Sequence, residues 1–227
     1  MSLVHRWLAT LSIPLLACAG TRYEKSLPPV PRISEADLSR KFSFAVDGRE
    51  LTLAAVAFDL PADYILGQQS YGLDGICTEA QASVNSSRWF GADLKYFTDV
   101  FADVMRQHGY PVDPGTTVVP GGQPEELRVG ARVFEAVCNF CTPRLVDKNG
   151  RKVGSAYLKI AWSVYSNLER KVVFEITTEG TTYSKIESNL GLEGLLRVAF
   201  ADAAQRLALS EGYRALLTPA MTPQRRQ

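Results

Sequence analysis

The stretch Ala156 to Glu179, AYLKIAWSVYSNLERKVVFEITTE, decides the fold. In its first half, apolar residues from Ala156 to Val164 occupy every second position, which is the period of a strand with one buried face. Val172 to Thr178 alternate with polar neighbours in the same way. The residues Ser166 to Glu169 leave room only for a turn, and strands joined this closely run antiparallel. The stretch therefore predicts a hairpin with one apolar face.

A third strand and two helices extend this unit in both directions. Leu127 to Val133 alternates apolar with polar residues, and the turn signal Asp147 to Gly150 joins it to the hairpin. Asp93 to His108 and Leu192 to Leu209 each carry apolar residues at spacings of three and four, and Gly109 is placed to end the first helix. These patterns predict an α+β fold, a two-layer sandwich of a mostly antiparallel sheet with two helices on one face.

The segments before the first long helix give weaker signals. Residues 33–50 predict a short helix or loop followed by a strand. Leu51 to Phe58 is apolar and predicts a strand, and Tyr64 to Tyr71 predicts a second extended piece. Small and polar residues dominate from Gly72 to Ser87, so we expect a long loop holding Cys77.

The amino terminus predicts export. His5 and Arg6 are followed by an apolar run, Trp7 to Ala17, that is too short to span a bilayer and is typical of a signal peptide. The run ends in Leu15-Leu16-Ala17-Cys18, which resembles the bacterial lipobox. That resemblance implies an acylated Cys18 carrying chains such as palmitate; the alternative is an ordinary thiol near a conventional cleavage site. Ala19, where enteric inner-membrane lipoproteins tend to carry Asp, favours the periplasmic face of the outer membrane.

These signals divide the chain into four parts. Residues 1–17 are the predicted lipoprotein signal peptide, and residues 18–40, which contain Pro28, Pro29 and Pro31, are a predicted flexible tether. Residues 41–217 form a single predicted α+β domain, and the polar, proline-containing residues 218–227 are a predicted disordered tail.

The charge balance argues against nucleic acid as a partner. The chain has 25 Lys and Arg against 24 Asp and Glu, and removal of residues 1–17 takes away Arg6 and leaves 24 of each. A neutral chain has no basic field for phosphates, and its membrane residence would depend on a lipid at Cys18.

The scarcity of histidine argues against most acid-base and zinc chemistry, because the mature chain keeps only His108. That residue falls on the apolar face at the end of a predicted helix, where a C-terminal cap is the ordinary role. Gly121 and Gly122 lack the Lys-Ser/Thr of a phosphate loop. We therefore expect no catalytic residue, no metal and no cofactor.

Three further cysteines follow Cys18. In an exported protein a disulfide is the expected state, and Cys77, Cys138 and Cys141 are the candidates. A direct bond between Cys138 and Cys141 needs a turn at Asn139-Phe140, since residues three apart in an extended strand are about 10 Å apart, beyond the roughly 7 Å limit. The more favoured pairing joins Cys77 to Cys138 or to Cys141.

The sheet face turned away from the helices is the expected binding surface. Polar residues on it would mix with aromatic ones, and the binding candidates are Tyr157, Tyr165 and, on a preceding segment, Trp89. Trp162 lies on the apolar side of its strand and is expected in the core. The polar positions predicted on the open face are Arg128, Arg132, Lys159, Ser163, Glu175 and Glu179.

The helix Tyr96 to Tyr110 and the strands Leu127 to Ala131 and Ile160 to Phe174 resemble a family of bacterial envelope modules. The layout is similar to the small lipoproteins of the curli-secretion type, to the amino-terminal domain of TolB and to the module preceding some secreted trypsin-like protease domains. The resemblance implies an assembly or adaptor role and brings no catalytic residue.

The sequence thus leads to one expected function and two alternatives. The first is a non-enzymatic, periplasm-facing lipoprotein that contacts a protein partner in the cell envelope, held to the membrane by its lipid anchor. The second is a module that binds peptidoglycan or another glycan. The third is an accessory domain that modulates a separate secreted protease.

Overall fold

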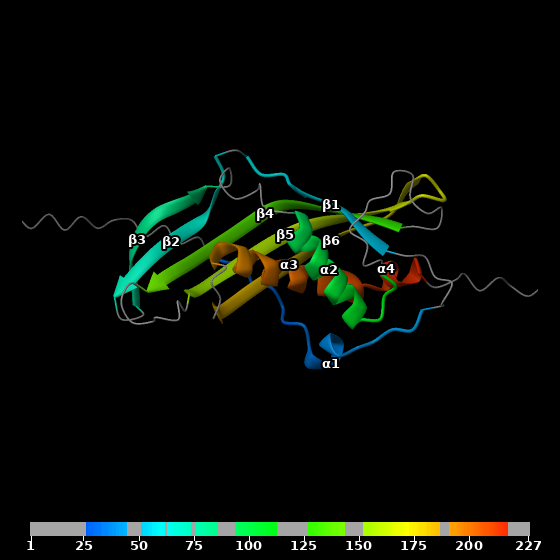
Figure 1. Cartoon of the computed structure of the whole chain (residues 1–227), viewed down its shortest axis with the longest axis horizontal. Coiled ribbons are helices and arrows are strands. Elements are labelled where there is room, and N and C mark those ends of the chain that lie inside the picture. The colour runs from blue at the N-terminus through cyan, green and yellow to red at the C-terminus, as the bar shows by residue number, and fades with distance from the viewer. Residues whose placement is uncertain are drawn as a thin grey trace, which may run out of the picture.

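The computed structural model describes residues 26–44, 51–61, 63–73, 76–85, 94–112, 127–143, 152–186 and 191–217. Within them lie six strands and four helices (Figure 1). The strands are β1 (Leu51–Phe58), β2 (Ile65–Leu73), β3 (Ile76–Asn85), β4 (Leu127–Pro143), β5 (Lys152–Ser166) and β6 (Lys171–Ile186). The helices are α1 (Glu35–Leu38), α2 (Leu94–Gln107), α3 (Gly191–Leu209) and α4 (Glu211–Ala215).

The sheet has the order β3-β2-β4-β5-β6, and β1 pairs with β4 beside this path. Strands β4, β5 and β6 are antiparallel neighbours, as the short connections predicted. Both β1 and β2 run parallel to β4: β1 pairs with its first half, Leu127 to Val133, and β2 with its last residues, Phe140 to Pro143. The fold is α+β, and its sheet is mixed, with the antiparallel hairpins predicted from the alternation at its centre.

One prediction about this sheet is wrong. The segment from Gly72 to Ser87, expected to be a loop, contains the strand β3, which pairs antiparallel with β2 from Leu73↔Ile76 to Ile65↔Asn85. Its sequence, ICTEAQASVN, alternates polar with apolar residues from Glu79 to Asn85, but two of the three apolar residues are alanines, which have a low strand propensity, so the signal was missed. Strand formation here is decided by backbone pairing with β2, because β propensity depends strongly on the neighbouring strand.

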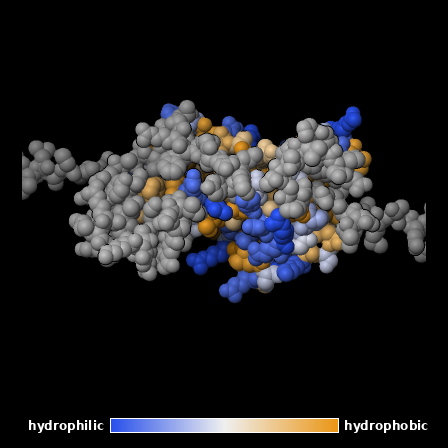
Figure 2. Space-filling view, in the orientation of Figure 1, coloured by the Kyte–Doolittle hydropathy of each residue, from blue (hydrophilic) through white to orange (hydrophobic). Residues whose placement is uncertain are grey.

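The two long helices cover one face of the sheet, as predicted (Figure 1). Their buried side chains share one core with alternate residues of β4 and β5, among them Phe101 of α2 and Phe200 of α3. The opposite side of α2 is hydrophilic (Figure 2), and Asp103 on that side pairs with Arg106 at 3.0 Å. None of the described helices is long and apolar enough to cross a membrane.

The end of α2 is shaped by Gly109. This residue has a φ of +84°, a left-handed conformation that glycine adopts without strain, and it stops the helix after Gln107 as the sequence predicted. A β-carbon at Gly109 would lie 2.3 Å from the carbonyl oxygen of Phe42. The helix end is therefore the place where an amino-terminal segment crosses the domain.

That amino-terminal segment, residues 31–44, is called the arm below. It includes α1, whose cap is Ser34: the hydroxyl accepts a hydrogen bond from the backbone N–H of Asp37 at 3.1 Å. Side chains of the domain bond to the arm at Pro31, Leu38 and Arg40. Residues 31–40, which the sequence assigned to the tether, thus lie against the domain.

Candidate functional site

The outer face of the sheet, opposite the helices, carries the candidate site. On β5 the side chains that alternate with the core residues point to this face, and each has direct neighbours on β4 and β6. Ser163 lies between Gly130 and Glu175, and the next row holds Ala161 between Arg132 and Thr177. Four of these six residues have small side chains or side chains that end in a hydroxyl. The side chains at the centre of the face therefore project less from the sheet than Arg132 and Glu175 beside them.

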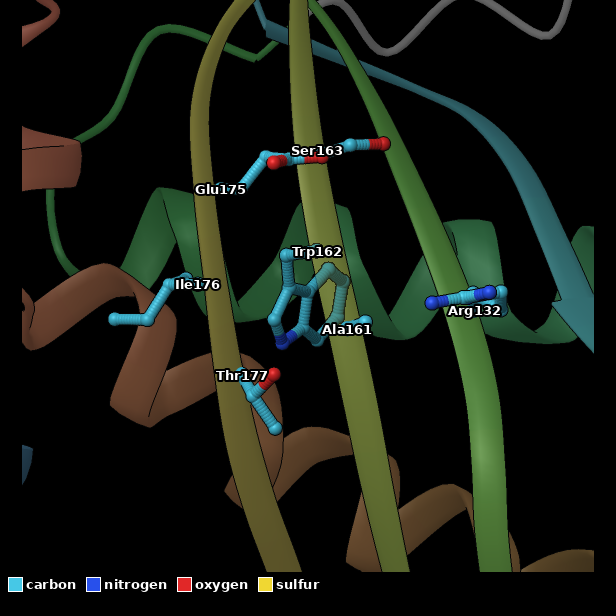
Figure 3. Close-up of a pocket in the computed structure, with 7 residues that line it drawn as sticks. All are labelled: Arg132, Ala161, Trp162, Ser163, Glu175, Ile176 and Thr177. Atoms are coloured by element: carbon cyan, nitrogen blue, oxygen red, sulfur yellow. The ribbon is translucent and has the colours of Figure 1, made fainter.

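These short side chains leave a hollow of about 690 Å³ at the centre of the face. Figure 3 shows that its lining comes from three adjacent strands, with the helices behind the sheet. Trp162 and Ile176 belong to the helix-facing side of their strands, so they contribute backbone to the floor. The residues that line it are Arg132, Ala161, Trp162, Ser163, Glu175, Ile176 and Thr177.

Opposite charges flank the hollow. The guanidinium of Arg132 stands on the β4 side and the carboxylate of Glu175 on the β6 side, in adjacent rows of the sheet. Arg132 Nη1 lies 3.4 Å from Asp59 Oδ2, an exposed pair that contributes little to stability. Lys159 pairs with Glu179 at 3.2 Å in the row beyond. The hollow can therefore meet both an acidic and a basic group of a ligand.

Apolar side chains border one end of the hollow. Tyr165 is 37% exposed and pairs directly across the strands with Val172, which is 48% exposed. Leu168 follows in the turn between β5 and β6 and is also exposed. An exposed aromatic residue beside polar groups is the kind of anchor found at protein interfaces.

Tyr157, a second predicted binding residue, does not belong to this surface, because it is only 1% exposed. It faces the same side of the sheet as Tyr165, but at the buried end of β5, where Val137 beside it on β4 is also buried. Burial and the carboxylates of Glu135 and Glu179 raise the pKa of Tyr157. The strand alternation predicted correctly which face of the sheet Tyr157 is on, but not that the face is buried at this end of β5.

The two tryptophans named from the sequence differ in outcome. Trp162 is in the core as expected; its indole N–H donates to Thr178 Oγ1 at 2.7 Å, and Thr178 in turn donates to the carbonyl of Ala203 at 2.9 Å. Trp89 lies outside the described residues, as does Cys18.

His108 lies at the end of α2 in an enclosed site, and the polar contact of its ring is with the arm, not with the helix carbonyls that the predicted cap would bind. Its side chain is fully buried, Nδ1 lies 2.8 Å from the carbonyl oxygen of Arg40, and the ring stacks on Phe42 with centroids 6.3 Å apart. Nε2 is buried with no hydrogen-bond partner. The residue joins the arm to the domain, a contact that the helix pattern alone did not predict.

The cysteines differ in whether they are free thiols or disulfide-bonded. Cys138 is a buried free thiol, so it is not the disulfide partner that the sequence allowed, and a Cys138–Cys141 bond is excluded. Burial raises the pKa of the Cys138 thiol, which makes it unreactive. Cys141 is disulfide-bonded. Cys77 lies in β3, of whose side chains the structure gives no description.

Within the described part of the chain, no group of three or more His, Cys, Asp or Glu side chains is placed to hold a metal ion.

Comparison with known proteins gives only distant structural matches. No family model matches the chain, and no curated protein matches it. A minor lipoprotein from Acinetobacter baumannii is 12% identical, with a TM-score of 0.33, over 73% of this chain and 97% of that one. A DUF330 protein from Xanthomonas campestris is 10% identical, with a TM-score of 0.30, over 78% and 91%. The PelC dodecamer from Paraburkholderia phytofirmans is 13% identical, with a TM-score of 0.32, over 72% and 94%. At these scores the likenesses carry no argument about function.

Proposed function

We propose that this chain is a non-enzymatic lipoprotein on the periplasmic face of a bacterial outer membrane, where it acts as an adaptor that holds a protein partner in an envelope complex. The observation that carries the proposal is the hollow on the outer sheet face, with Arg132 and Glu175 on opposite sides and Tyr165 at one end. The lipobox-like end of the signal segment, Leu15 to Cys18, supports both the lipid anchor and the proposed location in the cell envelope.

The hollow suits a protein surface because its chemistry is mixed. Arg132 can bind a carboxylate with two parallel hydrogen bonds, and its exposed pair with Asp59 is weak enough to be exchanged. Glu175 can meet a Lys or Arg side chain, while Tyr165 and Val172 supply an apolar anchor.

Site-directed photo-crosslinking in intact cells tests the adaptor role. A crosslinking residue at Thr177, which lines the hollow, is expected to capture one protein, and Arg132→Glu in the same chain should reduce that product about tenfold by placing like charges together. The same probe at the exposed Asp103 on α2 is the matched control and should capture no such product. Equal capture at both positions, or none at Thr177, would contradict the proposal.

Tyr165 supports glycan binding as a second candidate, because an exposed aromatic ring beside Ser163 and Glu175 is also a surface on which a sugar can stack and hydrogen-bond. Sedimentation with purified sacculi separates the two functions. A glycan-binding module would co-sediment and would lose this property in Tyr165→Ala, whereas a protein adaptor would stay in the supernatant.

The state of the cysteines points to one disulfide, and we propose that it joins Cys141 to Cys77. The alternative partner, Cys18, carries the proposed lipid, and Cys138 is free. The bond would tie β3 to β4 and would close a loop of about 60 residues.

Cys77→Ala is expected to lower the free energy of unfolding by about 2–4 kcal/mol, because an open loop gains entropy in the unfolded chain. Urea denaturation followed by circular dichroism measures the change. Cys138→Ala is the control: it removes no bond and only a small buried side chain, so its cost should be clearly smaller. Peptide mapping without reduction identifies the bonded pair, and a Cys18–Cys141 peptide would contradict the assignment.

A further inference from the structure

We infer that the arm, residues 31–44, is a releasable strap that sets how far the domain stands from its lipid anchor. Docked, the arm holds the domain close to the membrane; released, it lengthens the tether. The inference rests on the proposed lipid attachment at Cys18, but the strap itself is a feature of the domain and can be tested apart from the lipid.

The arm is held by hydrogen bonds from domain side chains to its own backbone carbonyls and by the packing of Phe42 and Phe44 against the edge of the core. Arg206 Nη2 donates to the carbonyl of Pro31 at 2.6 Å, and Gln107 Nε2 donates to that of Leu38 at 3.2 Å. His108 Nδ1 lies 2.8 Å from the carbonyl oxygen of Arg40. Water can bind these carbonyls after release, so each bond contributes only part of its strength to the docked state, and the bond from the charged Arg206 contributes the most.

Aromatic contacts complete the docking where the arm crosses the end of α2. The backbone N–H of Phe42 donates to the carbonyl of His108 at 2.9 Å, and the guanidinium of Arg214 lies 4.6 Å from the centroid of the Phe42 ring. Phe44 lies beside Tyr110 with centroids 4.6 Å apart. The absence of a side chain at Gly109 leaves room for this crossing.

Two features keep the strap weak. None of the arm's side chains is buried: those of α1 are exposed or half-buried, and so are Phe42 and Phe44. In addition, two of the side chains that bond the arm each keep one buried nitrogen without a hydrogen-bond partner, namely His108 Nε2 and Arg206 Nε. A buried unpaired donor or acceptor is unfavourable, and opening the arm would return both nitrogens to water.

Release of the strap would change the length of free chain between Cys18 and the domain. With the arm docked, the free chain runs from Cys18 to Pro31 and spans at most about 45 Å when fully extended. With the arm released, it runs to Leu51, where β1 begins, and spans up to about 110 Å. Figure 1 shows the arm (blue) passing along the side of the helices toward α4, apart from the sheet. Release would therefore leave the sheet and its outer face intact.

Hydrogen exchange in the full chain tests the strap. Arg206→Ala removes the bond to Pro31 and is expected to speed exchange of the Phe42 amide about tenfold, the change expected for loss of one charge-assisted hydrogen bond. Arg106→Ala is the matched control, because Arg106 also pairs with an aspartate on its own helix but does not bond the arm. Amides of β5 should be unchanged in both variants. Unchanged exchange at Phe42 in Arg206→Ala, or equal acceleration in β5, would overturn the strap.

The reach is tested on the lipidated chain bound to a supported bilayer of phosphatidylethanolamine and phosphatidylglycerol. Neutron reflectometry is expected to place the protein layer farther from the bilayer in Arg206→Ala than in the wild type or in Arg106→Ala. Faster exchange at Phe42 with an unchanged layer height would overturn the role in reach. A chain that does not bind the bilayer would instead refute the lipid anchor, while the exchange result would still report on the strap.

Discussion

Gly180→Ala is expected to destabilise the domain more than any other single methyl addition among its described glycines. A β-carbon at Gly180 would lie 1.9 Å from the carbonyl oxygen of Ala199 and 2.5 Å from the backbone nitrogen of Ala203. Both are backbone atoms of α3, so the rotation of a side chain cannot relieve the clash. The helix must therefore move away from β6. We expect a loss of at least about 3 kcal/mol, a large share of the stability of an ordinary domain.

Local contacts around Gly180 make this movement costly. Thr178 Oγ1 donates to the carbonyl of Ala203 at 2.9 Å, and the backbone N–H of Thr181 donates to Asp202 Oδ2 at 3.0 Å. Both hydrogen bonds connect β6 to the same turns of α3 and would be lost or stretched together. The methyl group therefore affects packing and hydrogen bonding at once.

Gly130→Ala is the control for this prediction. Its β-carbon would meet the side-chain oxygen of Ser163 at 3.0 Å, and that hydroxyl can rotate away. We expect a change below about 1 kcal/mol, partly offset by the lower backbone entropy of alanine in the unfolded chain. Urea denaturation of both variants measures the difference. Equal midpoints for Gly180→Ala and the wild type would show that α3 does not lie against β6 as described.

Trp162→Ala is expected to cost about 3–5 kcal/mol, as for other large aromatic residues removed from a core. The indole is 1% exposed and contacts Phe101 of α2 and Phe200 of α3, with ring centroids 6.1 and 5.5 Å away. It thus fills the space where both helices meet the sheet. Its removal leaves a cavity that only a shift of both helices could close.

Trp162→Phe separates the ring from its hydrogen bond. Phenylalanine keeps most of the apolar volume but cannot donate to Thr178, which still donates to Ala203. We expect a cost of about 1–2 kcal/mol, from the lost bond and the smaller ring together. Thermal and urea denaturation followed by circular dichroism measure both variants. If Trp162→Phe were as destabilising as Trp162→Ala, the hydrogen bond rather than the volume of the ring would be the main contribution.

Sequence periodicity predicted the central part of the fold well. The alternation from Ala156 to Thr178 corresponds to β5 and β6, and the helical spacing from Asp93 to His108 corresponds to α2. These segments bury one face each, so burial itself imposes the period that is visible in the sequence. The same alternation correctly predicted that Arg132, Ser163 and Glu175 share the outer face of the sheet.

Periodicity was uninformative where pairing or neighbours decide the structure. The alternation in strand β3 is carried by small residues, Ala80 and Ala82, and was too weak to predict the strand, which forms along β2. Strand β4 continues past Val133, where the predicted alternation ends, to Pro143. The burial of Tyr157 was missed because strand alternation gives the face of a residue but not what covers it. The hydrogen bonds of the arm were missed because they involve backbone carbonyls, which leave no pattern in the sequence.

The sequence by itself determined the α+β class, the central antiparallel strands, the two helices on one face and the polar character of the other, because each follows from local spacing and short connections. Only the tertiary structure decided that β1 and β2 share one edge of β4, that Cys138 is a free thiol, and that the arm lies across the end of α2. It also decided that small residues of three strands meet to form the hollow. These features depend on contacts between segments far apart in the chain, and local side-chain periodicity carries no information about such contacts.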